Sequence, residues 1–295
     1  MRPRLQILVA ALCFGTTGTA QALASTGSAV SVGAARIAVG GGLLATLAAA
    51  RGELSGLRRS WPLVLAAAAG VAGYQLAFFA AVRQTGVAVG TVVTIGSAAV
   101  LTGGAERLVE GTRQGVRWLC ATGLAVCGLA LVAAASAHGA PVAPGGVVLA
   151  LAAAAGYAGY AVLSKRLLRL GHEPGGVMGA TFGLAGALLV PALLATGSGW
   201  LATPRGVDLA VYLGVVPTAL AYLLYARGLR SVSAAETTTI GLAEPLTAAV
   251  LGVVALHERV VPAEVAGAAL ILAGLVALAV RLPRLRAPEP ALVEP

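Results

Sequence analysis

Ten apolar runs, each about 20 residues long and joined by short polar segments, fill nearly the whole chain. A run of that length is enough for one helix to cross a bilayer. The chain is 58% hydrophobic and 11% charged, against roughly 25% charged in an ordinary soluble domain. The sequence therefore predicts an all-α integral membrane protein, with helices near 5–24, 30–50, 62–82, 86–105, 115–135, 145–164, 175–196, 207–226, 232–256 and 263–282.

The two chain ends need separate interpretations. MRPR, followed by LQILVAALCFG and AQALAS, has the pattern of a cleavable signal peptide. However, its apolar stretch continues to about 20 residues and has a counterpart later in the chain, so we favour a first transmembrane helix. The tail 283–295 is Pro-rich and charged, which predicts disorder.

The positive charges predict an orientation. Of the 20 Lys and Arg, only Arg83, Arg205 and Arg259 fall on one side of the ten predicted helices, and Arg36 lies inside a helix. All the others fall on the side of the N-terminus. Because cytoplasmic loops carry the excess of Lys and Arg, we expect both termini in the cytoplasm and a multi-pass protein of the cytoplasmic membrane.

The second half of the chain repeats the first. ARIAVGGGLL (35–44) matches ATFGLAGALL (180–189), and AGVAGYQLAFFAAVR (69–83) matches LGVVPTALAYLLYAR (213–227). We divide the chain into repeats 1–138 and 139–282. Each holds five predicted helices, and since five is odd, the two repeats enter the membrane from opposite sides. Inverted repeats are typical of transporters that alternate between two packings around a midplane site.

A glutamate followed by a proline interrupts the ninth apolar run, TTTIGLAEPLTAAV (237–250). Pro245 cannot donate to the carbonyl of Gly241, so we expect the helix to bend there. An ionisable group at the bilayer centre costs about 2.5–3.5 kcal/mol and generally faces the interior of the bundle. Glu244 is predicted either to contact substrate or carry a proton, or to be a structural glutamate that fixes the bent helix.

The ending AETTTIGLAEPLTAAVLGVVALHERVVPAEVAGAALILAGLVAL (235–278) resembles EamA-type transporters of the drug/metabolite transporter superfamily. The resemblance covers nearly the whole chain. It implies ten helices in two five-helix repeats, and export of amino acids or related small metabolites. The chain departs from the family pattern at two places. Val100, which aligns with Pro245 in the repeat, stands where the family usually has a proline, and Phe14-Gly15 replaces a Trp-Gly pair.

Several other polar residues are predicted at membrane depth. Arg36 is expected either to pair with Glu244 or to extend to the outer surface. Tyr74, Gln75, Tyr157 and Tyr160 either line a cavity or form hydrogen bonds between helices. Thr237 and Thr247 are expected to share a helical face with Glu244, at spacings of i−7 and i+3, which predicts a polar side facing the pore.

The remaining polar clusters have plainer interpretations. Glu106, Arg107, Glu110 and Arg113, and likewise Glu258 with Arg259, are predicted to be solvated interfacial pairs. The three cysteines lie in apolar stretches and are interpreted as inert.

The absent motifs narrow the function. The chain has no GxxxxGK[ST] loop, and its three histidines have no metal-ligand spacing, so we expect no cofactor and no metal. The net charge of +9 comes from arginines in short clusters between apolar runs, so we expect no nucleic acid. The expected partners are a small-molecule solute and the lipid bilayer; oligomeric state stays open. A secondary transporter is the preferred function. A scaffold or channel subunit is the alternative, and a membrane enzyme acting on lipid-linked substrates would need surface residues that are missing.

Overall fold

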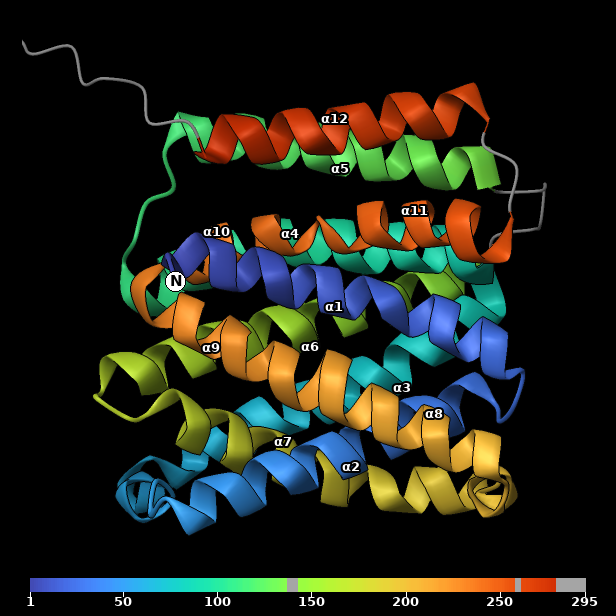
Figure 1. Ribbon diagram of the computed structural model, residues 1–295. Coiled ribbons are helices and arrows are strands. Elements are labelled where there is room, and N and C mark those ends of the chain that lie inside the picture. Colours follow the sequence, from blue (N-terminus) through green and yellow to red (C-terminus); the bar gives the residue numbers. More distant parts are fainter. Residues whose placement is uncertain (137–142, 258–260, 280–295) are drawn as a thin grey trace, which may run out of the picture.

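The computed structural model describes residues 1–136, 143–257 and 261–279, and every regular element in these ranges is a helix (Figure 1). The long helices are α1 Pro3–Ala24, α2 Ala29–Ala50, α3 Trp61–Thr91, α4 Ser97–Glu110, α5 Val116–Ser136, α6 Pro144–Arg169, α7 Pro174–Ala195, α8 Pro204–Gly214, α9 Ala221–Ser231, α10 Ala234–Gly241, α11 Glu244–Leu256 and α12 Pro262–Ala279. Short 3₁₀ or π segments are η1 Ser55–Ser60, η2 Val92–Gly96, η3 Gly199–Ala202 and η4 Val215–Leu220. Within the described ranges, nine helical stretches are long and apolar enough to cross a membrane.

One of these stretches, Ser55–Glu110, has 56 residues and is twice as long as a span needs to be. It is broken at Gly86, whose φ of 77° and ψ of 161° are not helical. A Cβ built on Gly90 would lie 3.1 Å from the Cα of Val82. Residues eight apart in a continuous helix are separated by about 12 Å. The chain therefore folds back on itself at Gly86, the position where the sequence places the start of a new helix.

Contacts between the helices follow the repeat. The matching second helices of the two halves, α2 and α7, pack on each other. The fifth helices, α5 and α12, do the same. The first helix of each half packs on the third of the other, as α1 does on α9 and α6 on α3. It also packs on the fourth of the other, as α1 does on α10 and α11 and α6 on α4. The two halves are thus interleaved, with equivalent contacts on both sides.

Small residues set the direction of the matching helices. A Cβ added to Gly41 would lie 2.1 Å from the carbonyl oxygen of Phe182, so α2 and α7 touch through their backbones. Three glycines of α7 face successively earlier residues of α2. Gly179 faces residues 44 and 48, Gly183 faces 41 and 45, and Gly186 faces 37 and 38. The same reversal relates α5 and α12, where Gly267 faces Gly128 and Gly274 faces Ala121. Matching helices of the two halves are therefore antiparallel.

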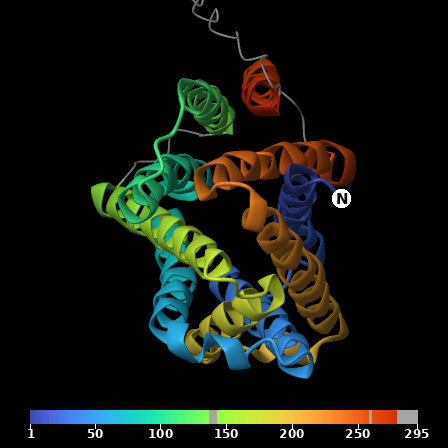
Figure 2. The same ribbon diagram turned by 90° about the vertical axis from the view of Figure 1, so that its left-hand side faces the viewer.

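The start of α1 and the end of α12 lie at the same end of the bundle (Figure 1). We call this end the N-terminal side. Viewed along the helices, green α5 and red α12 form a pair outside the other helices (Figure 2). The polar residues predicted at membrane depth lie in the remaining helices, between the two halves.

Candidate functional site

The Glu244–Pro245 pair stands at a break in the ninth predicted span. α10 ends at Gly241 and α11 begins at Glu244, with Pro245 in its first turn. The chain between them closes with tight turns, in which Leu242 N donates to Thr239 O at 3.1 Å and Ala243 N to Ile240 O at 3.0 Å. The helix is interrupted beside the Glu-Pro pair, and the interruption places a carboxylate at the start of a helix, where negative charge is favoured.

α1 packs directly on this break. A Cβ added to Gly15 would lie 2.5 Å from Cβ of Thr247 and 2.7 Å from the carbonyl oxygen of Glu244. Only a glycine permits this approach. The Phe14-Gly15 pair of the sequence is thus the point at which α1 contacts the candidate site.

Arg36 projects from α2 toward the same region. Its Nη1 donates to Thr17 Oγ1 of α1 at 3.4 Å, and its Nε is buried without a hydrogen-bond partner. Arg36 and Glu244 do not form an ion pair within 4.0 Å, although their charges interact electrostatically. The predicted direct pair is therefore not made in this structure. A buried guanidinium donor that lacks an acceptor is costly unless a ligand satisfies it.

Tyr74, Gln75 and Tyr157 stand next to these two charges. The phenol of Tyr74 interacts electrostatically with both Glu244 and Arg36, and that of Tyr157 with Glu244. The rings of Tyr74 and Tyr157 make an edge contact, with centroids 5.7 Å apart. Gln75 is 3% exposed and packs against Gly33 of α2. Tyr74 and Tyr157 therefore lie near Glu244, and Gln75 packs on α2 one turn before Arg36.

An aromatic network adjoins the charges. The chain contains only four Phe and six Tyr, and nine of these ten belong to one continuous chain of ring contacts, from which only Tyr212 is missing. The members are Phe14, Tyr74, Phe78, Phe79, Tyr157, Tyr160, Phe182, Tyr222 and Tyr225. They come from α1, α3, α6, α7 and α9, so both halves contribute.

The sequence identified only three members of this network. Phe78 and Tyr222 occupy matching positions in the repeat alignment of 69–83 with 213–227. In a chain with so few aromatic residues, an aromatic pair at matching positions of the two repeats could have predicted that Phe78 and Tyr222 belong to this network.

Thr237 and Thr247 lie on opposite sides of the helix break. Thr247 is on α11, contacts Gly15, and its Oγ1 donates to Ala243 O at 3.4 Å. Thr237 is on α10, fully buried, and its hydroxyl has no partner. The predicted common face assumed a continuous helix, and the break between Gly241 and Glu244 removes that relation. A role for Thr237 in binding stays a prediction.

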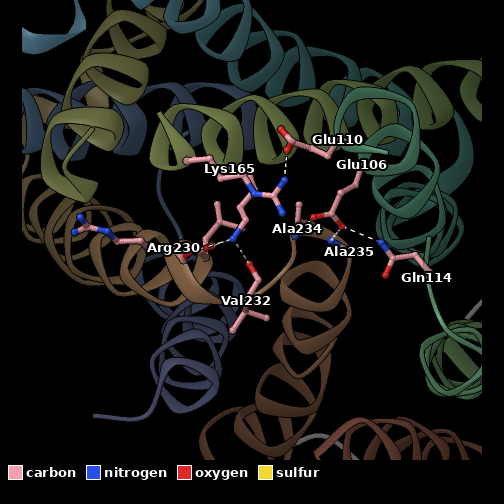
Figure 3. A network of polar contacts seen from close by, with 10 residues as sticks. Glu106, Glu110, Gln114, Lys165, Arg230, Val232, Ala234 and Ala235 are labelled. Atoms are coloured by element: carbon pink, nitrogen blue, oxygen red, sulfur yellow. Dashed lines mark hydrogen bonds and ion pairs between the residues drawn. The ribbon is translucent and has the colours of Figure 1, made fainter. Parts of the chain in front are cut away.

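The acidic residues at the end of α4 differ from their prediction as solvated pairs. Glu106 is fully buried and accepts hydrogen bonds from Ala234 N at 2.9 Å, Ala235 N at 3.1 Å and Gln114 Nε2 at 3.0 Å (Figure 3). Glu110 pairs with Arg169 of α6, not with its sequence neighbours Arg107 or Arg113. The prediction was wrong because the partners are backbone amides and a cation far along the chain. Glu258 and Arg259 lie outside the described residues.

An open pocket of about 540 Å³ lies on the opposite side, between α1, α8 and α11. Arg205 and Asp208 of α8 line it together with Thr16 and Thr19 of α1. The Tyr212 hydroxyl donates to Thr16 Oγ1 at 2.9 Å in its wall. The pocket does not contain Arg36 or Glu244, so it is separate from the charged and aromatic cluster.

Comparison with known proteins identifies the family. The model of the EamA-like transporter family matches twice, over residues 2–134 and 144–280. The chain belongs to the EamA-like transporter family. It is a multi-pass membrane transporter and not an enzyme. The first match includes α1, so this helix is part of the family's fold.

Two relatives and one solved structure agree with this membership. The chain is 39% identical over 275 residues to the uncharacterized transporter YwfM of Bacillus subtilis (strain 168), covering 93% of this chain and 92% of that protein. It is 33% identical over 132 residues to an uncharacterized transporter of Archaeoglobus fulgidus, covering 44% of this chain and 46% of the relative. A solved crystal structure matches with a TM-score of 0.81 and 22% identity over 94% of this chain and 96% of that one. This last likeness shows the fold alone.

The chemistry that the candidate site of this EamA-like transporter can offer follows from its side chains. The described part of the chain has no group of three His, Cys, Asp or Glu side chains that could hold a metal ion. What the residues do provide is one carboxylate, one guanidinium with a free donor, and a set of rings.

Proposed function

We propose that this transporter exports amino acids or related small zwitterionic metabolites by alternating access between ten spans arranged as two inverted repeats. The observation that carries the proposal is the arrangement of Arg36 and Glu244. The two charges act on the same phenol, that of Tyr74, yet they do not pair with each other, and Arg36 Nε has no acceptor. Opposite charges held apart at a half-buried site suit a solute that carries both charges.

The proposal gives each group a role. The carboxylate of the solute would bind Arg36, because a guanidinium presents several donors to a carboxylate. Its ammonium group would bind Glu244. Its side chain would lie against the aromatic network, where rings stabilise apolar groups and cations. A solute that brings both charges satisfies groups whose unpaired burial is unfavourable.

The architecture supports the transport mechanism. Antiparallel packing of α2 on α7 and of α5 on α12 supports the inversion, and the reversal at Gly86 supports ten spans over nine. We place the N-terminal side in the cytoplasm on the charge distribution of the sequence. Two inverted halves have two near-equivalent packings, and the site between them would open to each side in turn.

The experiment is counterflow in proteoliposomes with a panel of labelled amino acids, run with and without a pH gradient. We expect uptake of at least one zwitterionic amino acid, and no uptake of an anionic sugar phosphate. Glu244→Gln should reduce transport at least tenfold, and remove any response to the pH gradient if Glu244 carries the proton. Arg36→Lys tests the guanidinium while keeping the charge.

One control and two contrary outcomes complete the test. Arg205→Lys is the matched control for Arg36→Lys, since Arg205 is exposed in the separate pocket. Absence of flux for every zwitterion would contradict the substrate class. Unchanged transport and pH response in Glu244→Gln would leave Glu244 only its role in fixing the bent helix.

A further inference from the structure

A buried glutamate and a buried lysine hold the connection between α9 and α10, and the proposed transport site does not use them. Glu106 is 0% exposed and Lys165 is 5% exposed. They come from α4 and α6, and Figure 3 shows them on either side of the connection that contains Val232 and Ala234. Charges this deeply buried occur only where their hydrogen bonds are satisfied.

Lys165 binds the end of α9. Its ammonium group donates to Leu229 O at 2.7 Å, Arg230 O at 3.2 Å and Val232 O at 2.8 Å. The last carbonyls of a helix have no partner within the helix and carry partial negative charge. One ammonium with three donors thus satisfies three carbonyl groups at once.

Glu106 binds the start of α10 in the complementary way. Its two carboxylate oxygens accept from the amides of Ala234 and Ala235. The next amide, of Glu236, donates to Ser233 Oγ at 3.1 Å. All three leading amides of α10 therefore have acceptors, and two of these bonds depend on a side chain from the other half of the chain.

Further contacts fix α10 to the first half at this side. Arg4 of α1 pairs with Glu236 at 2.5 Å. Thr239 and Thr122 of α5 share a hydrogen bond at 2.9 Å. Opening of this side requires bonds between the two halves to break, whereas the bonds of Lys165 lie within the second half.

We propose that Glu106 and Lys165 are positioning residues that hold the α9–α10 connection and keep the N-terminal side of the transporter closed. Opening on this side then requires Glu106 to release the amides of Ala234 and Ala235, while Lys165 stays bound to α9. This inference rests on the proposed alternating access. It assigns the pair no contact with the solute.

Cysteine accessibility tests the proposal without knowledge of the solute. Cys13, Cys120 and Cys127 are replaced by alanine, and Thr237→Cys is the reporter, since Thr237 is fully buried in α10 and its hydroxyl has no partner. A second reporter, Thr19→Cys, lines the pocket on the opposite side. A membrane-impermeant maleimide is applied to inverted vesicles for the first reporter and to spheroplasts for the second.

We expect Glu106→Gln to raise labelling at position 237 from the cytoplasmic side about tenfold, because one lost hydrogen bond to a charged group shifts an equilibrium by that factor. The same variant should lower labelling at position 19 from outside. Lys165→Met should change both reporters in the same directions but by less, because Lys165 stays bound to α9 on opening and acts only by holding the connection in place for Glu106. Glu110→Gln is the matched control on the same helix. Because its ion pair with Arg169 is exposed and such pairs contribute little, we expect labelling to change less than twofold.

The outcomes separate the possible failures. A general loss of packing would raise labelling from both sides, so the opposite changes at positions 237 and 19 are specific to the proposal. Unchanged labelling in Glu106→Gln, or an increase on both sides, would overturn it. If the transporter shows no flux for any solute while the opposite changes persist, the proposed function fails and the role of the pair stands.

Discussion

The two halves of the broken span, α10 and α11, are adjacent in sequence but differ sharply in packing. Six of the eight residues of α10 are buried, and it bonds through backbone or side chains to α1, α4 and α5. In the thirteen-residue α11 only Gly252 is buried, and its contact with α1 depends on Gly15. One half is fixed by polar bonds to the other repeat, and the other packs mainly on α1, with its closest approach at Gly15.

The difference shows where movement of the span is inexpensive. Leu242 and Ala243 separate the two helices, and Pro245 removes the hydrogen bond that would join them across Gly241. α11 can therefore change its angle without breaking the bonds of α10. Because Glu244 is the first residue of α11, such a change moves the carboxylate relative to Arg36.

The largest effect is expected from breaking the contact between α1 and α11. Gly15→Val would place side-chain atoms on the backbone of Glu244, which cannot yield, and overpacking of this kind costs about 1–3 kcal/mol. We expect transport to fall more than tenfold and the melting temperature in detergent to drop by several degrees. Gly18→Val is the control, since nothing lies within 4 Å of a Cβ there. Equal effects at both positions would show that the close approach at Gly15 has no special importance for α11.

Local sequence signals predicted part of this arrangement. The ten apolar runs predicted the helices, and the Glu-Pro pair predicted the break, because both signals are local and follow from bilayer thickness and proline chemistry. The repeat predicted opposite orientations of the two halves, and the antiparallel matching helices agree with it. These features needed no knowledge of which side chains meet.

Glu106 could not be assigned in this way. Its neighbours Arg107 and Arg113 are exposed, so the local pattern is that of a surface cluster. Its partners are backbone amides more than a hundred residues away, and a backbone amide has no signature in the sequence. Lys165 was likewise counted with the loop charges, although three carbonyls hold it in the interior.

A smaller effect is expected when the break itself is repaired. Pro245→Ala restores an amide that can donate to Gly241 O, which favours a continuous helix and reduces the freedom of α11. The new hydrogen bond, about 1 kcal/mol, offsets the lost proline rigidity of about 0.4–1 kcal/mol, so stability should change little. Transport should fall several-fold in counterflow. Pro204→Ala, in the first turn of α8, is the control and should leave transport unchanged. Normal transport in Pro245→Ala would mean that the break does not serve movement.

The smallest effect measures how firmly α10 is attached. Thr122 and Thr239 share a buried hydrogen bond between α5 and α10, and such bonds between membrane helices average about 0.6 kcal/mol in double-mutant cycles. Thr122→Val, Thr239→Val and the double variant should give a coupling energy near that value in unfolding measurements. The same cycle with Thr122→Val and Thr247→Val should give none, because the Thr247 hydroxyl bonds within its own segment, to Ala243 O. Coupling of equal size in both cycles would mean that α11 is attached as firmly as α10. It would then be unable to change its angle alone, and Glu244 would move only together with the whole span.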